Sequence, residues 1–161
     1  MDVGEHKDDP TMKVAVKEIT WYGEDDLEKI KKEIKSERKF KSKHVCELKA
    51  AYKTKEDEKG IFLVLEYCNG GNLFNYFEKS KITENDIFEI ISQILKPFVD
   101  HDEQKLIYGD IKPGNILVKI EDKKPIFKIA HFGSSRILSP SSILRTTFKG
   151  TPLYMSPEQL N

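Results

Sequence analysis

The spacing of apolar residues changes several times along this 161-residue chain, and these changes limit the folds it can adopt. Residues 13–20 alternate β-branched and lysine side chains with a period of two, which predicts a strand. Residues 24–40 carry leucine and isoleucine at helical spacing, which predicts an amphipathic helix. Residues 45–52 and 61–67 return to strand-like patterns and are joined by a charged turn. The first half therefore predicts a strand, a helix and two strands.

The second half predicts helices first and short strands later. A glycine pair breaks the pattern at 70–71, and residues 73–78 then predict a short helix. Thr83 and Asp86 form a sequence similar to a capping box, after which residues 84–102 carry one long apolar helical face. Beyond this helix, short apolar runs alternate with turns, which indicates small strands and loops.

The charge balance excludes some classes of partner. The chain has 27 Lys plus Arg and 27 Asp plus Glu, so the basic surplus of a general nucleic-acid binder is absent. The longest apolar run, residues 61–65, is far shorter than the roughly 20 residues that cross a bilayer as a helix. The amino terminus is acidic and polar, unlike a secretory signal. We therefore expect a cytoplasmic or nuclear protein with no membrane span and no nucleic-acid partner.

Cysteine and histidine residues give no metal-binding pattern. Cys46 and Cys68 are the only cysteines, and their spacing matches neither a metal site nor a disulfide framework. We interpret both as reduced, small hydrophobic residues. His44 is expected to be a surface or strand-end residue, and Tyr108 a core residue.

One loop combines side chains that suit phosphoryl transfer. Residues 108–118, YGDIKPGNILV, place Asp110, Lys112 and Asn115 close together before a strand. A carboxylate can accept a hydroxyl proton, an ammonium can stabilise a moving phosphoryl group, and a carboxamide oxygen can bind magnesium. A β-turn whose Asp and Asn satisfy their own backbone explains the same residues, so this loop alone leaves both interpretations open.

Four further motifs accompany this loop in a characteristic order. They are VAVK at 14–17, FLVLEYCNGGNL at 62–73, KIAHFG at 128–133 and GTPLYMSPE at 150–158. The ordered set resembles a eukaryotic protein kinase catalytic domain of the serine/threonine type. The resemblance implies an incomplete two-lobed α+β fold, with a small antiparallel-sheet lobe carrying one helix and the first half of a helical lobe.

The resemblance also implies a domain organisation. It covers nearly the whole chain as a single partial domain, 1–161, truncated at both ends. Residues 1–12 are expected to be disordered or irregular, because they show no periodicity and hold a single glycine. Residues 13–67 would form part of the N-lobe, and residues 68–161 would form part of the C-lobe through the Ser-Pro-Glu motif.

The resemblance assigns ATP binding to seven residues. Lys17 matches the strand lysine that holds the α and β phosphates, and Glu33 is the best match for the helix glutamate that pairs with it. The remaining five match the gatekeeper, the hinge and the apolar residues on either side of the adenine ring: Leu65 at the gatekeeper, Glu66 and Cys68 in the hinge, and Ala15 and Leu117 at the adenine.

The resemblance assigns catalysis to the loop described above. Asp110 matches the catalytic base, Lys112 the phosphate-contacting lysine, and Asn115 one magnesium ligand. ATP and Mg2+ are the implied cofactors. Lys112 and Thr151 resemble the serine/threonine branch, so protein serine or threonine hydroxyls are the implied substrates. The activation segment would contain Thr146, Thr147 and Thr151.

Two departures from the family pattern leave alternative functions open. His131 occupies the position of the magnesium-binding Asp, although magnesium prefers oxygen ligands to imidazole nitrogen. Gly109 replaces the Arg that normally receives an activation-loop phosphate. One hypothesis is a serine/threonine kinase, and the alternative is a pseudokinase that acts as a nucleotide-binding or protein-interaction scaffold. A protonated His131 that donates to a phosphate without metal is a third possibility.

Overall fold

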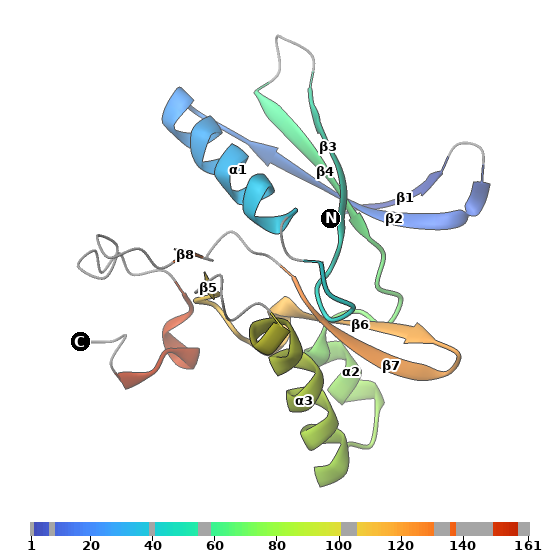
Figure 1. The fold of residues 1–161 in the computed structure, drawn as a ribbon. Coiled ribbons are helices and arrows are strands. Elements are labelled where there is room, and N and C mark those ends of the chain that lie inside the picture. Colours follow the sequence, from blue (N-terminus) through green and yellow to red (C-terminus); the bar gives the residue numbers. More distant parts are fainter. Residues whose placement is uncertain are drawn as a thin grey trace.

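The computed structural model describes residues 2–6, 9–38, 41–54, 59–100, 106–130, 136–137 and 150–157. Figure 1 shows a twisted sheet with one helix above a group of two helices and a strand hairpin. The upper sheet has four strands in the order β1-β2-β4-β3. These strands are β1 Asp2–His6, β2 Asp9–Thr20, β3 Leu48–Lys53 and β4 Gly60–Glu66.

The central strands β2 and β4 are antiparallel, and their register aligns the predicted nucleotide-binding residues. Ala15 lies opposite Leu65, and Lys17 lies opposite Leu63. Ala15, Leu63 and Leu65 are buried, as expected for strands whose apolar side chains face a core. The sequence pattern therefore predicted both strands correctly, although β2 begins before residue 13.

Helix α1, Glu24–Glu37, packs beside this sheet (Figure 1). Its first turn is acidic, which suits the positive end of the helix dipole. Leu27 and Ile30 are buried in the same cluster as the sheet residues. The helix predicted from apolar spacing over residues 24–40 is therefore confirmed.

The expectation that residues 1–12 are disordered or irregular is wrong for their described part. Strand β1 pairs with β2, with Val3 opposite Ala15 and Gly4 opposite Val14. The backbone groups at the outer edge of β2 find hydrogen-bonding partners in β1, so a short polar segment with no apolar period becomes ordered. Sequence periodicity does not detect this kind of strand, because it depends on a neighbouring edge.

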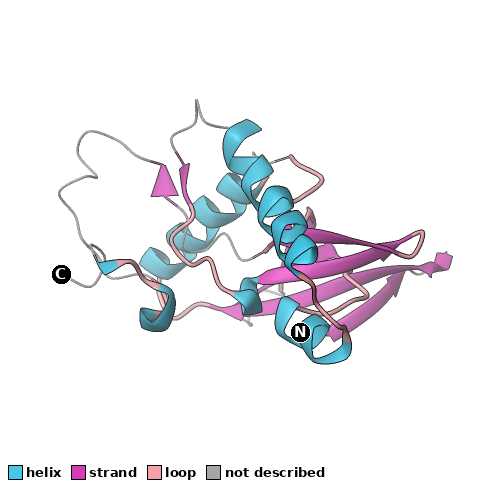
Figure 2. Cartoon of the chain, turned by 90° about the horizontal axis from the view of Figure 1, so that it is seen from below, coloured by secondary structure: helices cyan, strands magenta, loops and turns pink. Residues whose placement is uncertain are grey.

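Two helices and a β-hairpin lie below the four-stranded sheet in Figure 1, and Figure 2 shows the molecule from that side. Helix α2 spans Leu73–Lys79 and helix α3 spans Glu84–Asp100, while β6 Ile116–Glu121 pairs with β7 Lys124–Ile129. Asp122 and Lys123 both have positive φ, as a type I′ turn requires. Three side chains of this hairpin are fully buried: Val118, Phe127 and Ile129. Short elements complete the description: β5 Leu106–Ile107, β8 Arg136–Ile137, and 3-10 turns at Pro113–Asn115 and Pro152–Tyr154.

The predicted capping box at the start of α3 is confirmed. The Thr83 N–H donates to Asp86 Oδ2 at 2.8 Å, and the Asp86 N–H donates to Thr83 Oγ1 at 3.3 Å. The apolar face of α3 divides in two, because Ile90 and Ile94 are buried while other members remain about half exposed or more. The exposed members are Ile87, Phe88, Ile91, Leu95 and Val99.

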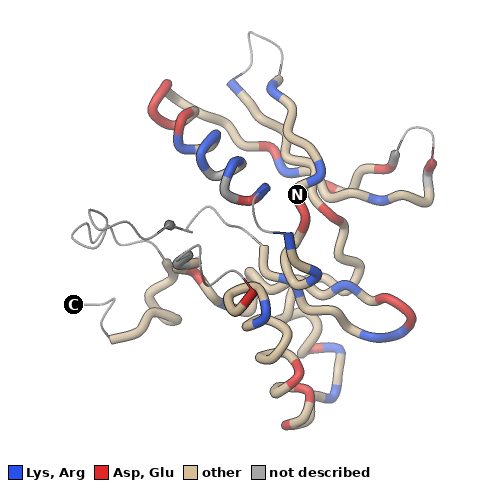
Figure 3. The backbone as a smooth tube through the Cα atoms, in the orientation of Figure 1, with Lys and Arg blue, Asp and Glu red and all other residues tan. Residues whose placement is uncertain are grey.

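The charges of the described residues are mixed. Figure 3 shows basic and acidic residues interspersed along α1 and next to each other at the turn between β6 and β7. None of the helices in the described part of the chain has the length and apolar character needed to cross a membrane.

Candidate active site

Three predicted catalytic and activation-segment side chains contact the carboxylate of a fourth, Asp110. Lys112 Nζ lies 2.9 Å from Asp110 Oδ2, and Asn115 Nδ2 donates to the same oxygen at 2.7 Å. Thr151, 41 residues after Asp110, donates its hydroxyl to Asp110 Oδ1 at 2.8 Å. Lys112 Nζ also donates to Thr151 Oγ1 at 2.6 Å. The structure therefore brings together Asp110, Lys112, Asn115 and Thr151.

The local sequence explains the shape of this loop. Gly109 has a φ of 83°, a conformation that glycine adopts without steric cost. Pro113 then starts a 3-10 turn, and the Asn115 N–H donates to the Lys112 carbonyl at 2.9 Å. Asn115 Nδ2 also donates to the Asp110 carbonyl at 2.9 Å, so part of the predicted self-satisfied turn is present. The contact with Thr151 is not part of such a turn.

A second glycine allows the Thr151 segment to approach the loop. Gly150 has a φ of 145°, and a Cβ at this position would lie 2.8 Å from the Gly109 carbonyl oxygen. This distance is shorter than a side-chain carbon tolerates, so the close approach requires glycine. From the sequence, Gly109 was interpreted only as the replacement of an arginine. In the structure its positive φ shapes the loop, and its carbonyl oxygen is the atom that Gly150 approaches.

The hydrogen bonds keep the Asp110 carboxyl ionised. Burial alone would raise its pKa, but hydrogen bonds from Lys112, Thr151 and Asn115 outweigh this effect. The pKa of Asp110 therefore lies below its ordinary value. An ionised carboxylate at neutral pH can accept a proton from a hydroxyl group placed against it.

Tyr108 connects the loop to the end of strand β7. Its buried hydroxyl donates to the Ala130 carbonyl, and its ring packs edge-on against Phe98 at 6.5 Å between centroids. The Ala130 N–H donates to the Asn115 carbonyl at 2.9 Å. Burial and the charge of Asp110 raise the pKa of Tyr108, so its hydroxyl stays protonated. The expected core role of Tyr108 is confirmed, and Ala130 is held against the predicted catalytic loop.

The apolar residues predicted to contact adenine come from both parts of the chain. Ala15 of β2 belongs to a buried cluster that includes Ala130, and Leu117 of β6 packs against this cluster. Leu65 of β4, the predicted gatekeeper, lies opposite Ala15 in the same cluster. Lys17 follows Ala15 by two residues, so both lie on the same face of β2. Because Ala130 is also bonded to the catalytic loop, the structure links the predicted adenine-binding residues to the predicted catalytic residues.

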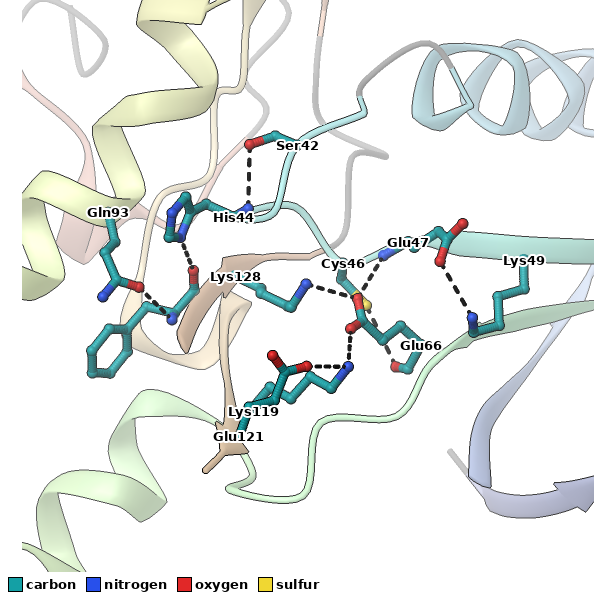
Figure 4. Close-up of polar contacts among 11 residues, drawn as sticks. Ser42, His44, Cys46, Glu47, Lys49, Glu66, Gln93, Lys119, Glu121 and Lys128 are labelled. Atoms are coloured by element: carbon teal, nitrogen blue, oxygen red, sulfur yellow. Dashed lines mark hydrogen bonds and ion pairs between the residues drawn. The ribbon is translucent and has the colours of Figure 1, made fainter. Parts of the chain in front are cut away.

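The side chain of Glu66 is buried and connects the end of β4 to the β6–β7 hairpin through ion pairs (Figure 4). Its carboxylate lies 2.7 Å from Lys119 Nζ and 3.0 Å from Lys128 Nζ, both on the β6–β7 hairpin. The Glu47 N–H donates to Glu66 Oε2 at 3.4 Å. Burial opposes ionisation of Glu66, but hydrogen bonds from Lys119 and Lys128 outweigh it and lower the pKa. We name these three side chains, Glu66, Lys119 and Lys128, the interlobe brace.

His44 is buried, so the expectation of a surface residue is wrong, and it lies four residues before β3 begins, so it is not at the end of that strand either. Its Nδ1 lies 3.1 Å from the Phe127 carbonyl oxygen (Figure 4). Its own carbonyl accepts the Ile129 N–H at 2.9 Å. Burial lowers the pKa of His44, an effect that the contact with Phe127 only partly opposes. Residues 44–46 thus attach to the end of β7, and no local sequence pattern indicates this contact.

Several predicted site residues lie wholly or partly outside the described residues. These are His131, Thr146 and Thr147, together with the side chain of Glu33, whose backbone belongs to α1. Cys68 follows β4 and is partly exposed. The segment after it docks on β6, because the Gly70 N–H donates to the Val118 carbonyl at 2.8 Å.

The donor set does not fit an ordinary magnesium site. Asn115 supplies a carboxamide beside Asp110, but the second family position carries the imidazole of His131. Magnesium takes near-octahedral oxygen coordination and exchanges it reluctantly for nitrogen. Within the described ranges, no group of three His, Cys, Asp or Glu residues could hold a metal ion. We therefore assign no step of the chemistry to a metal.

A lysine-bearing strand, a buried apolar cluster that joins this strand to β6, and an Asp-Lys-Asn loop are the features of a protein kinase-like fold. Comparison with known proteins agrees, because the model of the protein kinase domain family matches residues 3–161. The chain therefore belongs to the protein kinase family, which as a class uses ATP and Mg2+ and acts on protein substrates.

Curated relatives of the chain are serine/threonine kinases. The chain is 33% identical over 163 residues to calcium/calmodulin-dependent protein kinase type 1 of Macrobrachium nipponense, covering 98% of this chain and 45% of that protein. It is 34% identical over 152 residues to human myosin light chain kinase family member 4, covering 93% and 38% respectively. It is 39% identical over 108 residues to serine/threonine-protein kinase ATG1a of Arabidopsis thaliana, covering 66% and 17%. The chain thus spans less than half the length of each of these relatives.

Proposed function

We propose that this chain transfers the γ-phosphoryl group of ATP to serine or threonine hydroxyls of a protein substrate. The observation that carries this proposal is the hydrogen-bonded group at Asp110, in which Lys112 and Thr151 both contact the carboxylate. Thr151 comes from a distant segment, so the group is more than a self-satisfied turn. The names of relatives that are called serine/threonine-protein kinases support the same substrate class.

The proposed binding mode divides ATP between the two lobes. Ala15 and Leu117 would pack on either side of the adenine ring, Leu65 would be the gatekeeper, and Lys17 would contact the α and β phosphates. Cys68 would contribute backbone groups and Glu66 its carbonyl oxygen, since the Glu66 carboxylate is occupied by Lys119 and Lys128 and its N–H by the Glu47 carbonyl. Glu33 would pair with Lys17 from α1.

The proposed reaction takes place at Asp110. The substrate hydroxyl oxygen would attack the γ phosphorus as the bond from that phosphorus to the bridging oxygen breaks, so ADP leaves. The Asp110 carboxylate would accept the hydroxyl proton. The Lys112 ammonium would stabilise charge on the moving phosphoryl group, and Thr151 would hold both side chains in position. Thr146 and Thr147 are proposed as further activation-segment residues.

A pseudokinase is the second candidate function, and His131 is the observation that favours it. Replacement of a magnesium-binding carboxylate by imidazole removes an oxygen ligand that the family uses. In this case the same residues would bind a nucleotide, or the domain would support a scaffold partner, without phosphoryl transfer.

Radiolabelled ATP and a generic protein substrate such as casein distinguish the two candidates. The kinase proposal expects transfer that Asp110→Asn reduces by at least about a hundredfold. It also expects Lys17→Ala to reduce transfer. Wild-type transfer no greater than that of Asp110→Asn contradicts the proposal. If ATP still raises the melting temperature and Lys17→Ala removes that rise, the pseudokinase candidate is supported.

A second variant tests the metal position directly. His131→Asp restores an oxygen ligand, so we expect this substitution to raise transfer in the presence of magnesium. Titration of ATP with and without EDTA provides the matching binding measurement. Binding that is unaffected by EDTA and weakens as pH rises would instead support a protonated His131 that contacts a phosphate.

A further inference from the structure

A cavity of about 680 Å³ lies between the end of α1, the segment that leads into β3, and the end of β7. Its lining includes Val45 and Leu48, which are buried and apolar, and Lys128, whose side chain is only 8% exposed. Cavities of this volume commonly hold small organic molecules. Of the predicted site residues in the described part of the chain, only Glu66 lines it, so the cavity is separate from the group at Asp110.

The buried Lys128 ammonium has more hydrogen-bond donors than the structure gives it acceptors. An ammonium group carries three N–H donors, and a buried polar group needs partners. Among the described residues, the carboxylate at Lys128 Nζ is that of Glu66, at 3.0 Å (Figure 4). The same carboxylate is shared with Lys119 at 2.7 Å. An anion in the cavity would therefore meet a cation whose own partner is divided between two lysines.

Three further cations line the cavity: Arg38, Lys41 and Lys43. All three are exposed, and the described part of the chain gives none of them an ion-pair partner. Arg38 directly follows α1, where a cation also offsets the negative end of the helix dipole. Lys41 and Lys43 lie beyond the last turn of this helix, where the dipole no longer acts, so the dipole does not account for them.

The backbone holds Lys43 in a defined place. The Val45 N–H donates to the Ser42 carbonyl at 3.1 Å, which closes a turn around Lys43. The His44 carbonyl accepts the Ile129 N–H at 2.9 Å and attaches this turn to β7. Groups that are held in position before a ligand arrives lose less conformational entropy when it binds.

The lining also contains the acidic residues Glu37, Glu47 and Glu66. Two of these carboxylates have lysine partners, since Glu66 belongs to the interlobe brace and Glu47 Oε2 lies 3.3 Å from Lys49 Nζ. Even with the charge of Glu37 counted in full, the three exposed cations give the cavity an excess of positive charge.

We propose that this cavity binds a phosphate group, either as free phosphate or as the phosphate monoester of a small organic molecule. A phosphate dianion has the charge and the acceptor oxygens to contact Lys128 and the exposed cations together. The organic part of a monoester would pack on Val45 and Leu48. The proposal does not depend on phosphoryl transfer at Asp110.

Isothermal titration calorimetry at pH 8 and low salt tests the proposal, with inorganic phosphate and phenyl phosphate as probes. Phenyl phosphate is then a dianion, because the second pKa of a phosphate monoester is about 6. We expect a Kd of about 1 mM or tighter, and weaker binding as salt is raised. Tighter binding of phenyl phosphate assigns the site to an organic phosphate, whereas equal affinities assign it to free phosphate.

Charge reversal locates the bound phosphate. Lys41→Glu combined with Lys43→Glu should weaken binding at least about tenfold, which corresponds to about 1.4 kcal/mol. Lys79→Glu combined with Lys81→Glu is the matched control, because it makes the same charge change at the same spacing on exposed residues outside the cavity lining. This control should bind as the wild type does. Lys17→Ala should also leave the affinity unchanged, which separates this cavity from the predicted ATP site.

Three results would overturn the proposal. They are the absence of binding at millimolar concentrations of both probes, loss of binding in Lys17→Ala, and equal weakening in the two double variants. Trp21 fluorescence verifies that each variant is folded, which we expect because Lys41 and Lys43 are exposed. If the double variant does not fold, Lys43→Gln alone provides the comparison.

Discussion

Replacement of Glu66 by Gln tests whether the interlobe brace stabilises the domain. The Glu66 and Lys128 side chains are only 10% and 8% exposed, and their charged atoms lie 3.0 Å apart. Gln preserves the size and hydrogen-bonding capacity of the side chain but removes its charge. The Lys128 ammonium would then be buried without a full negative partner, which is unfavourable in a region of low dielectric.

The structure sets the size of the expected effect. Loss of one partner from a buried ion pair costs about 3–5 kcal/mol of unfolding free energy. Lys119 contributes less, because it is 28% exposed and retains a contact with Glu121 at 2.8 Å. We therefore expect Glu66→Gln to cost about 3 kcal/mol, mainly through Lys128. Combining it with Lys128→Met removes the unpaired ammonium and should recover about half of that loss.

Urea unfolding followed by tryptophan fluorescence provides the assay, since Trp21 is the only tryptophan and is buried at the end of β2. The wild type, both single variants and the double variant form a thermodynamic cycle. Glu28→Gln is the matched control, because its ion pair with Lys31 is more than half exposed on both sides and its loss should have no measurable effect. The reasoning is refuted if Glu66→Gln is as stable as Glu28→Gln, or if the two brace substitutions are additive.

His44→Gln should flatten the dependence of stability on pH below neutrality. Burial depresses the pKa of His44 below 6.5, so the unfolded chain binds a proton more readily, and the wild type loses stability as pH falls below about 6.5. Equal slopes for both proteins in urea titrations from pH 7 to 5 would contradict this. Gly150→Ala should cost about 1–3 kcal/mol by the same assay, because of its positive φ and the nearby Gly109 carbonyl. Gly23→Ala is the control, since nothing lies within 4 Å of its added Cβ, and an equal loss would refute the steric argument.

Much of the fold follows from apolar periodicity. The patterns that predicted the helix at 24–40 and the strand at 61–67 correspond to α1 and β4, because each element has one side against a core. The Thr83 capping box was predicted equally well, since its hydrogen bonds join residues three apart. Such local features need no knowledge of the remaining chain.

The strand at residues 2–6 could not be predicted in this way. It has no apolar period of its own, and it forms by pairing with the edge of β2 that β4 does not cover. His44 is a similar case, since its burial results from contacts with Phe127 and Ile129 more than 80 residues away. The candidate site likewise contains residues that the sequence predicts and contacts that it does not. The motif order indicated Asp110, Lys112 and Asn115, whereas the hydrogen bonds of Thr151 with that group required the folded chain.

The amino-acid order alone was sufficient to indicate the family, the types of element and the residues that match its chemistry, because motifs and periodicity are properties of short stretches. The brace at Glu66 and the burial of His44 depend on the tertiary fold. Each joins residues at least 20 positions apart, and contacts of that range exist only when the sheet and the β6–β7 hairpin pack against each other.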